Sequence, residues 1–353
     1  MSLRLSGKIS IMNSLSVGIV GVGHLGEAHL RKYLDIPEAE LAGFWDIDDR
    51  VRNAIRKKYS VRAFDSLESL LENVQAVSIV VPTSSHASAA TAAAEKGVHI
   101  FIEKPIAPNL ADADRIIDAA RKNNIKLQVG HIERFNAAFR SLFAGAPPLS
   151  GTGYPNKEIN PKFIESHRLA SFDPRGLDVS VIHDLMIHDI DLILQLIGSP
   201  IMHIDASGVG VISDMPDIVN ARLSFANGAV ANITASRISQ KKMRKMRLFQ
   251  KDSYISMDFV TGETEIYSIS DSGSSESVSL LDGIIPVMNL NYGDITKSVG
   301  YKKIPNDGKD ALELELRSFL HSITTDTDPP VTGEEARKAL EVALEVVEKT
   351  MKN

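Results

Sequence analysis

The chain has 353 residues, 43% of them hydrophobic and 24% charged, and its formal net charge is −6 at pH 7. This composition indicates a folded protein of two ordinary domains, and it argues against nucleic acid as a partner because phosphate binding demands a basic surface. There is no cysteine, no apolar run of membrane-spanning length and no motif that predicts a metal site, so we expect a cytoplasmic protein with a small-molecule partner and no membrane association.

Strand-like and helical patterns alternate in the first third of the chain. Short apolar runs occupy 16–22, 40–46, 76–82, 99–103 and 126–131, and helical patterns occupy 26–36, 48–59 and 111–123. Alternation at these lengths predicts βαβ units around a parallel sheet covered on both faces. We therefore expect an α/β fold with a Rossmann dinucleotide-binding domain over residues 14–132.

Three glycines, Gly21, Gly23 and Gly26, follow the first apolar run with the spacing G-x-G-x-x-G. The first allows a sharp turn, the second lets a pyrophosphate approach the backbone, and the third lets the helix pack closely, with the helix N-terminus facing the anion. Asp46 ends the next strand and can accept hydrogen bonds from ribose hydroxyls. No arginine follows it directly, which favours NAD over NADP; the alternative is a tight turn without a ligand. The expected cofactor contacts here also include His24 and Leu25.

Two further strand ends should contribute to the same crevice. In the stretch 81–86, Pro82 ends a strand, and Thr83 and His86 could face the cofactor. In the stretch 102–105, Pro105 keeps Lys104 out of helical geometry, so its ammonium is fixed where it can stabilise a developing alkoxide beside the nicotinamide. The alternative is a surface lysine paired with Glu103, which we also expect near the cofactor.

Beyond a stretch rich in proline and glycine at 145–156, strand-like runs recur without regular helical spacers, at 163–169, 218–225, 229–238, 245–250 and 253–259. They predict a large, mostly antiparallel open sheet with one face packed and the other available to a substrate or another subunit. We assign residues 133–353 to this second α/β domain, which would bind the substrate and mediate oligomerisation.

One helix, predicted over 179–198, carries a polar stripe on an otherwise apolar surface. Asp184, His188, Asp191 and Gln195 share one face at 3.6 residues per turn. Buried polar groups need partners, so the stripe either braces the core, holds a metal, or faces a ligand. The arrangement favours acid–base chemistry, in which His188 accepts a proton and Asp184, one turn earlier, orients the imidazole and raises its basicity.

Together the segment "GIVGVGHLG", Asp46, "VPTSSH", "EKP" and "DLMIHDID" resemble the glucose–fructose oxidoreductase, inositol dehydrogenase and MocA family. The resemblance extends to a final helix at 329–350, which could pack back on the first domain. It implies a Rossmann domain joined to an open-sheet domain used for dimer or tetramer assembly. It also implies that Lys104, Asp184 and His188 occupy catalytic positions and that a sugar hydroxyl is oxidised by NAD.

The segments 130–136 and 165–191 are similar to those of a subgroup that includes UDP-N-acetylglucosamine 3-dehydrogenases. An anionic diphosphate requires cations, and the candidates are Arg134, Arg168, Arg175 and Arg237. We interpret the basic run 241–247 as a solvated strand, since its charges do not alternate onto one face. A free sugar or inositol is the alternative substrate, and a dinucleotide-binding sensor without turnover is the alternative function.

Overall fold

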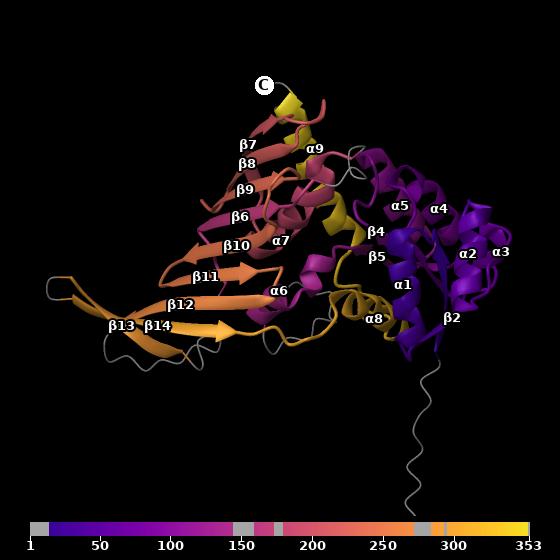
Figure 1. The fold of residues 1–353 in the computed structure, drawn as a ribbon, viewed down its shortest axis with the longest axis horizontal. Coiled ribbons are helices and arrows are strands. Elements are labelled where there is room, and N and C mark those ends of the chain that lie inside the picture. Colours follow the sequence, from indigo (N-terminus) through magenta and orange to yellow (C-terminus); the bar gives the residue numbers. More distant parts are fainter. Residues whose placement is uncertain (1–13, 144–158, 173–178, 272–283, 293–294, 352–353) are drawn as a thin grey trace, which may run out of the picture.

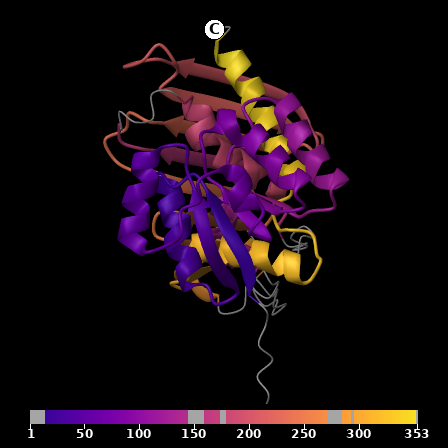
Figure 2. The same cartoon turned by 90° about the vertical axis from the view of Figure 1, so that its right-hand side faces the viewer.

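The computed structural model describes residues 14–143, 159–172, 179–271, 284–292 and 295–351. Two β-sheets stand next to each other, and helices from the end of the chain lie between them (Figure 1). Figure 2, turned by 90°, shows the first sheet in front of the second. No helix in the described segments combines the length and the apolar character needed to cross a membrane.

The first sheet has five parallel strands in the order β2-β1-β3-β4-β5. Its strands are β1 (Leu15–Val20), β2 (Ala39–Trp45), β3 (Ala76–Ile79), β4 (His99–Glu103) and β5 (Leu127–Gly130). The helices around it are α1 (His24–Asp35), α2 (Asp49–Tyr59), α3 (Leu67–Leu71), α4 (His86–Glu95) and α5 (Leu110–Lys122). Successive residues of β4 enter opposite core layers: Phe101 packs with α1 and α8, whereas Ile100 and Ile102 pack with α4 and α5. The predicted parallel sheet with two covered faces is therefore confirmed.

The second sheet has nine strands in the order β13-β14-β12-β11-β10-β6-β9-β8-β7. Its pairs are antiparallel except for β6 and β9, which run parallel. The strands are β6 (Phe163–Leu169), β7 (Ile201–Val209), β8 (Ile218–Phe225), β9 (Val230–Ser236), β10 (Met243–Gln250), β11 (Ser253–Asp258), β12 (Glu263–Asp271), β13 (Ile285–Tyr292) and β14 (Ile295–Ile304). The predicted mostly antiparallel open sheet is thus confirmed.

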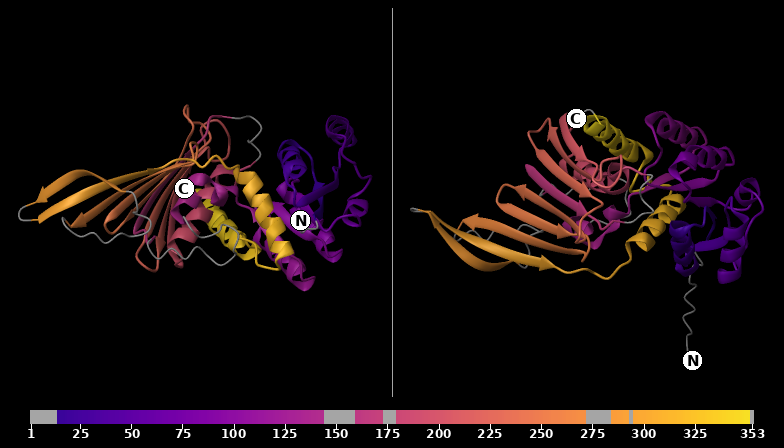
Figure 3. Two further views of the ribbon diagram at one scale, coloured as in Figure 1. Left: turned by 90° about the horizontal axis from the view of Figure 1, so that it is seen from below. Right: turned by 45° about the horizontal axis from the view of Figure 1, so that its top comes forward.

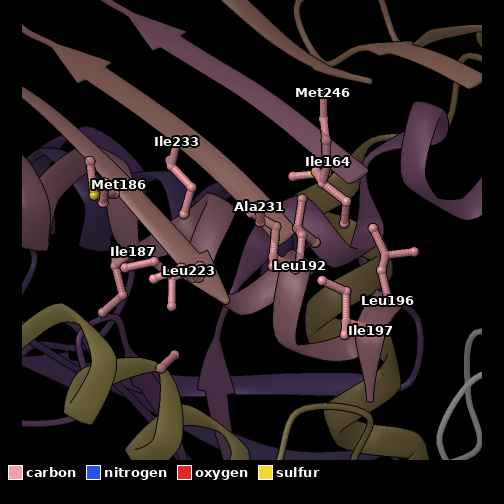
Figure 4. Close-up of a cluster of buried hydrophobic side chains, with 14 of the residues drawn as sticks. Ile164, Met186, Ile187, Leu192, Leu196, Ile197, Leu223, Ala231, Ile233 and Met246 are labelled. Atoms are coloured by element: carbon pink, nitrogen blue, oxygen red, sulfur yellow. The ribbon is translucent and has the colours of Figure 1, made fainter. Parts of the chain in front are cut away.

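One face of the second sheet is covered by helices. Ile164, Leu223, Ile233 and Met246 of its strands meet Met186 and the side chains of α7 (Ile187–Ile197), as Figure 4 shows. The opposite face lies away from these helices (Figure 3). This one-sided burial gives the alternating buried pattern of β6, in which Ile164, Ser166 and Arg168 point inward.

The C-terminal helices join the two sheets. Helix α8 (Ala311–Thr324) packs against the first sheet through Leu316, Phe319 and Leu320. Helix α9 (Gly333–Met351) contributes Ala336 and Leu340 to the core of the first sheet and Ala339, Val342 and Val346 to that of the second. The final helix therefore contacts both halves of the molecule.

Several elements differ from the sequence prediction. Strands β7 and β12–β14 and helices α3, α4 and α8 were not expected, and the alanine-rich α4 lacks the apolar period that would mark it. The helix expected over 179–198 is divided into a π-helical segment, Ile182–Met186, and the regular helix α7. Because a π-helix has a wider turn, residues of this segment do not keep the alignment of a uniform α-helix.

Candidate active site

The glycine turn between β1 and α1 borders a pocket of about 450 Å³ that is also lined by Asp46 and Pro82. Gly21 has φ +86°, and a Cβ there would lie 2.6 Å from the carbonyl oxygen of Val80. A Cβ at Gly26 would lie 2.0 Å from the carbonyl oxygen of Gly21, whereas one at Gly23 would meet no atom within 4 Å. The first and third glycines are thus required by packing, and the second leaves open space where an anion can reach the start of α1.

Asp46 is held beside this turn. Its carboxylate accepts hydrogen bonds from the backbone N–H groups of Val22 at 2.8 Å and Asp48 at 3.0 Å. The carboxylate therefore has a defined position at the pocket wall, which suits it to bind ribose hydroxyls. Together with the anion-accessible turn, this wall fits the nucleotide half of a dinucleotide.

The other expected cofactor contacts lie in different settings. His24 and Leu25 form the exposed first turn of α1, and Thr83 begins a short 3₁₀ turn after Pro82. His86 differs from the expectation: it is buried, its Nε2 lies 3.0 Å from the Val81 carbonyl and its Nδ1 3.1 Å from the Pro105 carbonyl. Because both ring nitrogens are occupied by backbone oxygens, His86 ties the two strand ends together instead of facing the pocket.

Lys104 follows β4 at the carboxyl edge of the first sheet and is joined to Pro105 by a cis peptide bond. Its ammonium does not pair with the carboxylate of Glu103, which instead lies 3.0 Å from Nε2 of His29. Burial opposes ionisation of Glu103, but the hydrogen bond with His29 and the charge of Lys104 leave the pKa of Glu103 below its ordinary value. The alternative of a surface lysine paired with Glu103 is therefore excluded.

The Lys104 ammonium instead crosses to the second half of the molecule. Nζ donates to the backbone carbonyl of Asp184 at 2.8 Å and to its carboxylate at 3.2 Å. The lysine side chain is 16% exposed and the Asp184 side chain 51% exposed, so the pair is open to solvent on the Asp184 side. We call this junction of the two halves, where Lys104 meets Asp184, the crevice. Residues 80 positions apart thus meet at one point.

His188 lies on the first turn of α7, close to this ion pair. Burial and the positive charges of Lys104 and Arg168 hold the pKa of His188 well below its ordinary value, so the imidazole is neutral at physiological pH. Its Nδ1 is buried and has no hydrogen-bond partner among the described residues. The expectation that Asp184 orients and activates His188 is therefore wrong: Asp184 belongs to the π-helical segment and is held by Lys104.

Two more histidines, His131 and His183, lie within electrostatic reach of Lys104 and were not singled out from the sequence. His131 directly follows β5, and in the described structure neither of its buried ring nitrogens has a hydrogen-bond partner. Burial lowers the pKa of His131 and of His183, and Lys104 lowers both further. The signal that could have found His131 is its position at the end of a parallel strand, where ligands of such sheets bind.

Three arginines expected to bind a substrate diphosphate are buried and already paired. Arg134 donates to both oxygens of Asp191, at 2.7 and 2.5 Å. Arg168 donates to Asp189 at 2.8 Å and to Glu133 at 2.7 Å.

The third, Arg237, donates to the Val179 carbonyl at 2.5 Å. The expectation fails for all three because their donors brace the chain; Arg175, the fourth candidate, lies outside the described residues. Gln195 of the polar stripe also binds another part of the chain, since it donates to Glu335 at 2.9 Å.

A larger cavity of about 840 Å³ lies between α7, β7 and α9. Arg134, Asp191, Gln195 and Glu335 are among its lining residues, but Lys104, Asp184 and His188 are not. The described residues contain no group of three or more acidic or histidine side chains arranged to hold a metal ion. Because Lys104 and Asp184 meet outside this cavity, we place the candidate active site at the crevice where their side chains are in contact.

The first sheet carries a glycine-turn pocket, and it meets the second sheet at the crevice, where Lys104 and His188 lie. These features together define a dinucleotide-binding oxidoreductase. Residues 15–131 match the GFO/IDH/MocA oxidoreductase family, which has an NAD-binding Rossmann fold, and residues 163–255 match the GFO/IDH/MocA C-terminal domain. The chain belongs to the GFO/IDH/MocA family and is an NAD-dependent oxidoreductase.

Among its relatives is the UDP-N-acetylglucosamine 3-dehydrogenase of Acidithiobacillus ferrooxidans, 36% identical over 95% of this chain and 97% of the relative. The solved structure of that enzyme superposes with a TM-score of 0.81 over 96% of this chain and 98% of the other, at 34% identity. The myo-inositol 2-dehydrogenase of Thermotoga maritima is 26% identical over 92% of this chain and 93% of the relative. Levoglucosan dehydrogenase in complex with NADH shares the fold, with a TM-score of 0.78 and 18% identity over 96% of this chain and 98% of the other.

Proposed function

We propose that this oxidoreductase converts the 3-hydroxyl of UDP-N-acetylglucosamine to a 3-ketone. The observation that carries the reaction type is the meeting of Lys104 with Asp184 beside His188, at the edge where the glycine-turn sheet faces the second sheet. The substrate is supported by the 36% identity, over nearly the whole chain, to an enzyme named for that reaction.

The chain's own residues supply position, charge and a proton acceptor. NAD⁺ supplies the hydride acceptor when it binds along the glycine turn and Asp46. A neutral His188 is able to take the proton from the reacting hydroxyl, and its low pKa lets the proton pass on to solvent afterwards. Lys104 stabilises the negative charge that develops on the same oxygen. Asp184 fixes the lysine, because it accepts two of the three hydrogen bonds that an ammonium can donate.

We also propose that the molecule forms a homodimer or homotetramer through the outer face of the second sheet. Five aromatic rings, Phe163, Phe249, Tyr254, Tyr267 and Tyr301, are paired across adjacent strands with centroid distances of 5.6, 5.0, 5.7 and 4.9 Å. Phe249 is 37% exposed. An apolar row on the face opposite the helices supports a sheet-to-sheet contact between copies. The cytoplasmic location remains a prediction of the sequence.

The test is turnover with NAD⁺ and three substrate classes: UDP-N-acetylglucosamine, myo-inositol and free aldoses. We expect NADH to form with UDP-N-acetylglucosamine, and mass spectrometry to show a sugar product that has lost two hydrogen atoms. Mass analysis is needed because an enzyme that retains NADH would give little absorbance change. Oxidation of inositol or an aldose alone would contradict the substrate, and tight NAD binding without any product would favour a sensor.

A further inference from the structure

Arg244 is a cation of the crevice that differs from the buried arginines around it. It lies on β10 directly opposite Arg168 of β6 in the antiparallel register, and it shares a face with the buried Met246 and Leu248. Its side chain therefore points to the helix-covered side of the sheet, where α7 carries His188. The Arg244 side chain is 33% exposed, so it is partly open to solvent.

The hydrogen-bonding capacity of Arg244 is mostly unused. Among the described residues its only side-chain partner is Oε1 of Glu133, at 3.5 Å, and that oxygen already accepts from Arg168 at 2.7 Å. A guanidinium has five N–H donors. Burial and the neighbouring charge of Arg168 lower the pKa of Arg244, which means that the positive charge is poorly compensated by the protein.

The surroundings place this cation within electrostatic reach of the reacting groups. The charge of Arg244 contributes to the lowered pKa of His188, and the charge of Asp184 acts on Arg244. The exposed Lys241 and Lys242 lie just before β10, in a connection whose Ser239 donates to the carbonyl of Ala170 at 3.0 Å. This connection lies at the end of the sheet where Arg237 donates to the Val179 carbonyl, just before the π-helical segment Ile182–Met186.

We propose that Arg244 is the anion-binding residue of the substrate site and contacts the diphosphate of a nucleoside diphosphate sugar. The inference rests on the proposed function and deepens it. In such a substrate the diphosphate is attached at the anomeric carbon, one pyranose ring away from the 3-hydroxyl. Arg244 lies on the sheet face that α7 covers, and its charge reaches His188, which suits that separation. Arg134, Arg168 and Arg237 are already bound to other groups of the chain. Arginine presents paired donors to phosphate oxygens, which gives orientation as well as affinity.

The strand provides a matched control. Arg247 lies on the same strand but on the opposite face, is 32% exposed, and likewise has a carboxylate, that of Glu165, at 3.5 Å. Replacing either arginine by glutamine removes one partly exposed charge from one long ion pair. Glu133 retains Arg168 in the Arg244→Gln variant, so no buried carboxylate is left alone and the fold should be preserved.

The experiment measures UDP binding by calorimetry to the wild-type protein and to Arg244→Gln, Arg244→Lys and Arg247→Gln, each saturated with NADH so that UDP cannot occupy the dinucleotide pocket. We expect Arg244→Gln to weaken UDP binding about tenfold or more, the loss of a charge-assisted hydrogen bond. Arg244→Lys should bind several-fold more weakly than wild type and keep its salt dependence. Arg247→Gln should match wild type, and neutral uridine should bind all four proteins alike.

Equal UDP affinity in wild type and Arg244→Gln would overturn the proposal, as would the absence of UDP binding to wild type or an equal loss in Arg247→Gln. The melting temperature and the NADH affinity of each variant show whether it is folded. If Arg244→Gln is not folded, the UDP affinity of Arg244→Lys is compared with that of the wild type instead. Because UDP binding involves no turnover, failure of the wild type to oxidise UDP-N-acetylglucosamine would refute the proposed function and leave this result readable.

Discussion

Replacement of Lys104 by methionine removes the ammonium and keeps an unbranched stem of similar length. The three donors of Lys104 are divided between Asp184, which accepts two, and the crevice, which is left with one. Loss of one fixed donor aimed at a developing oxyanion costs about 10²–10³ in kcat. We therefore expect Lys104→Met to lose about that factor in kcat, with little change in NAD affinity. Asp184 is half exposed, so its unpaired carboxylate stays hydrated and the variant should fold.

The same variant should change the pH profile in a defined direction. Lys104 is one of the charges that lower the pKa of His188, so its removal raises that pKa. A base must be deprotonated to act, hence activity rises with pH through the pKa of His188, and the acidic limb of kcat/KM should move to higher pH. The assay is the initial rate of NADH formation from about pH 4 to pH 9, a range extended below the ordinary titration range of histidine because the pKa of His188 is lowered.

Lys96→Met is the control, because Lys96 is a surface lysine of the same sheet region paired with Glu68 and Glu72. It should retain the wild-type rate and profile. The reasoning is refuted if Lys104→Met keeps kcat within a few-fold of wild type, or if its acidic limb stays in place or moves to lower pH.

Four further predictions concern binding, stability and assembly. Arg168→Met leaves buried carboxylates without their partner and should lower the free energy of unfolding by about 3–5 kcal/mol in urea titrations; a loss below about 1 kcal/mol would contradict the role as a brace. Gly26→Ala forces a Cβ against a backbone oxygen, so NAD affinity and melting temperature should both fall, whereas Gly23→Ala should lower NAD affinity alone. Burial raises the pKa of Glu315 well above its ordinary value, so the stability of the wild type declines as pH rises above the ordinary carboxyl range. Glu315→Gln should therefore raise the free energy of unfolding by more than about 1 kcal/mol at pH 8 and by little at pH 4. Equal effects at the two pH values would refute this. Tyr254→Glu should shift the sedimentation coefficient to that of a smaller species, and an unchanged value would exclude this sheet face as the interface.

The first sheet and its glycine turn were predictable because their signals are local. Each signal lies within a short stretch of chain: the alternation of strand-like and helical hydrophobic patterns, the G-x-G-x-x-G spacing, and the acidic residue at the end of a strand. Lys104 was predictable for the same reason, since Pro105 and the preceding strand define its position. The partner of Lys104 was not, because Asp184 lies on a π-helical segment where the 3.6-residue wheel does not hold.

The arginines show where sequence reasoning stops. Charge near the expected crevice indicated Arg134 and Arg168, but whether a cation is free depends on which acid the tertiary structure brings to it. Asp191 and Asp189 of α7 form ion pairs with Arg134 and Arg168, so neither arginine is available to a ligand. Arg244 was missed because the basic run 241–247 showed no clean alternation of charges onto one face. The strand begins only at Met243, so the two lysines at 241 and 242 precede it and obscure the alternation within it.

The measurement that tests the central claim most directly is a crystal structure with NADH and UDP-N-acetylglucosamine bound. The account predicts that the 3-hydroxyl oxygen lies within about 2.6–3.2 Å of both Lys104 Nζ and a ring nitrogen of His188, with C3 facing the nicotinamide. A sugar bound in the cavity between α7 and α9, or one whose 3-hydroxyl contacts neither side chain, would contradict it.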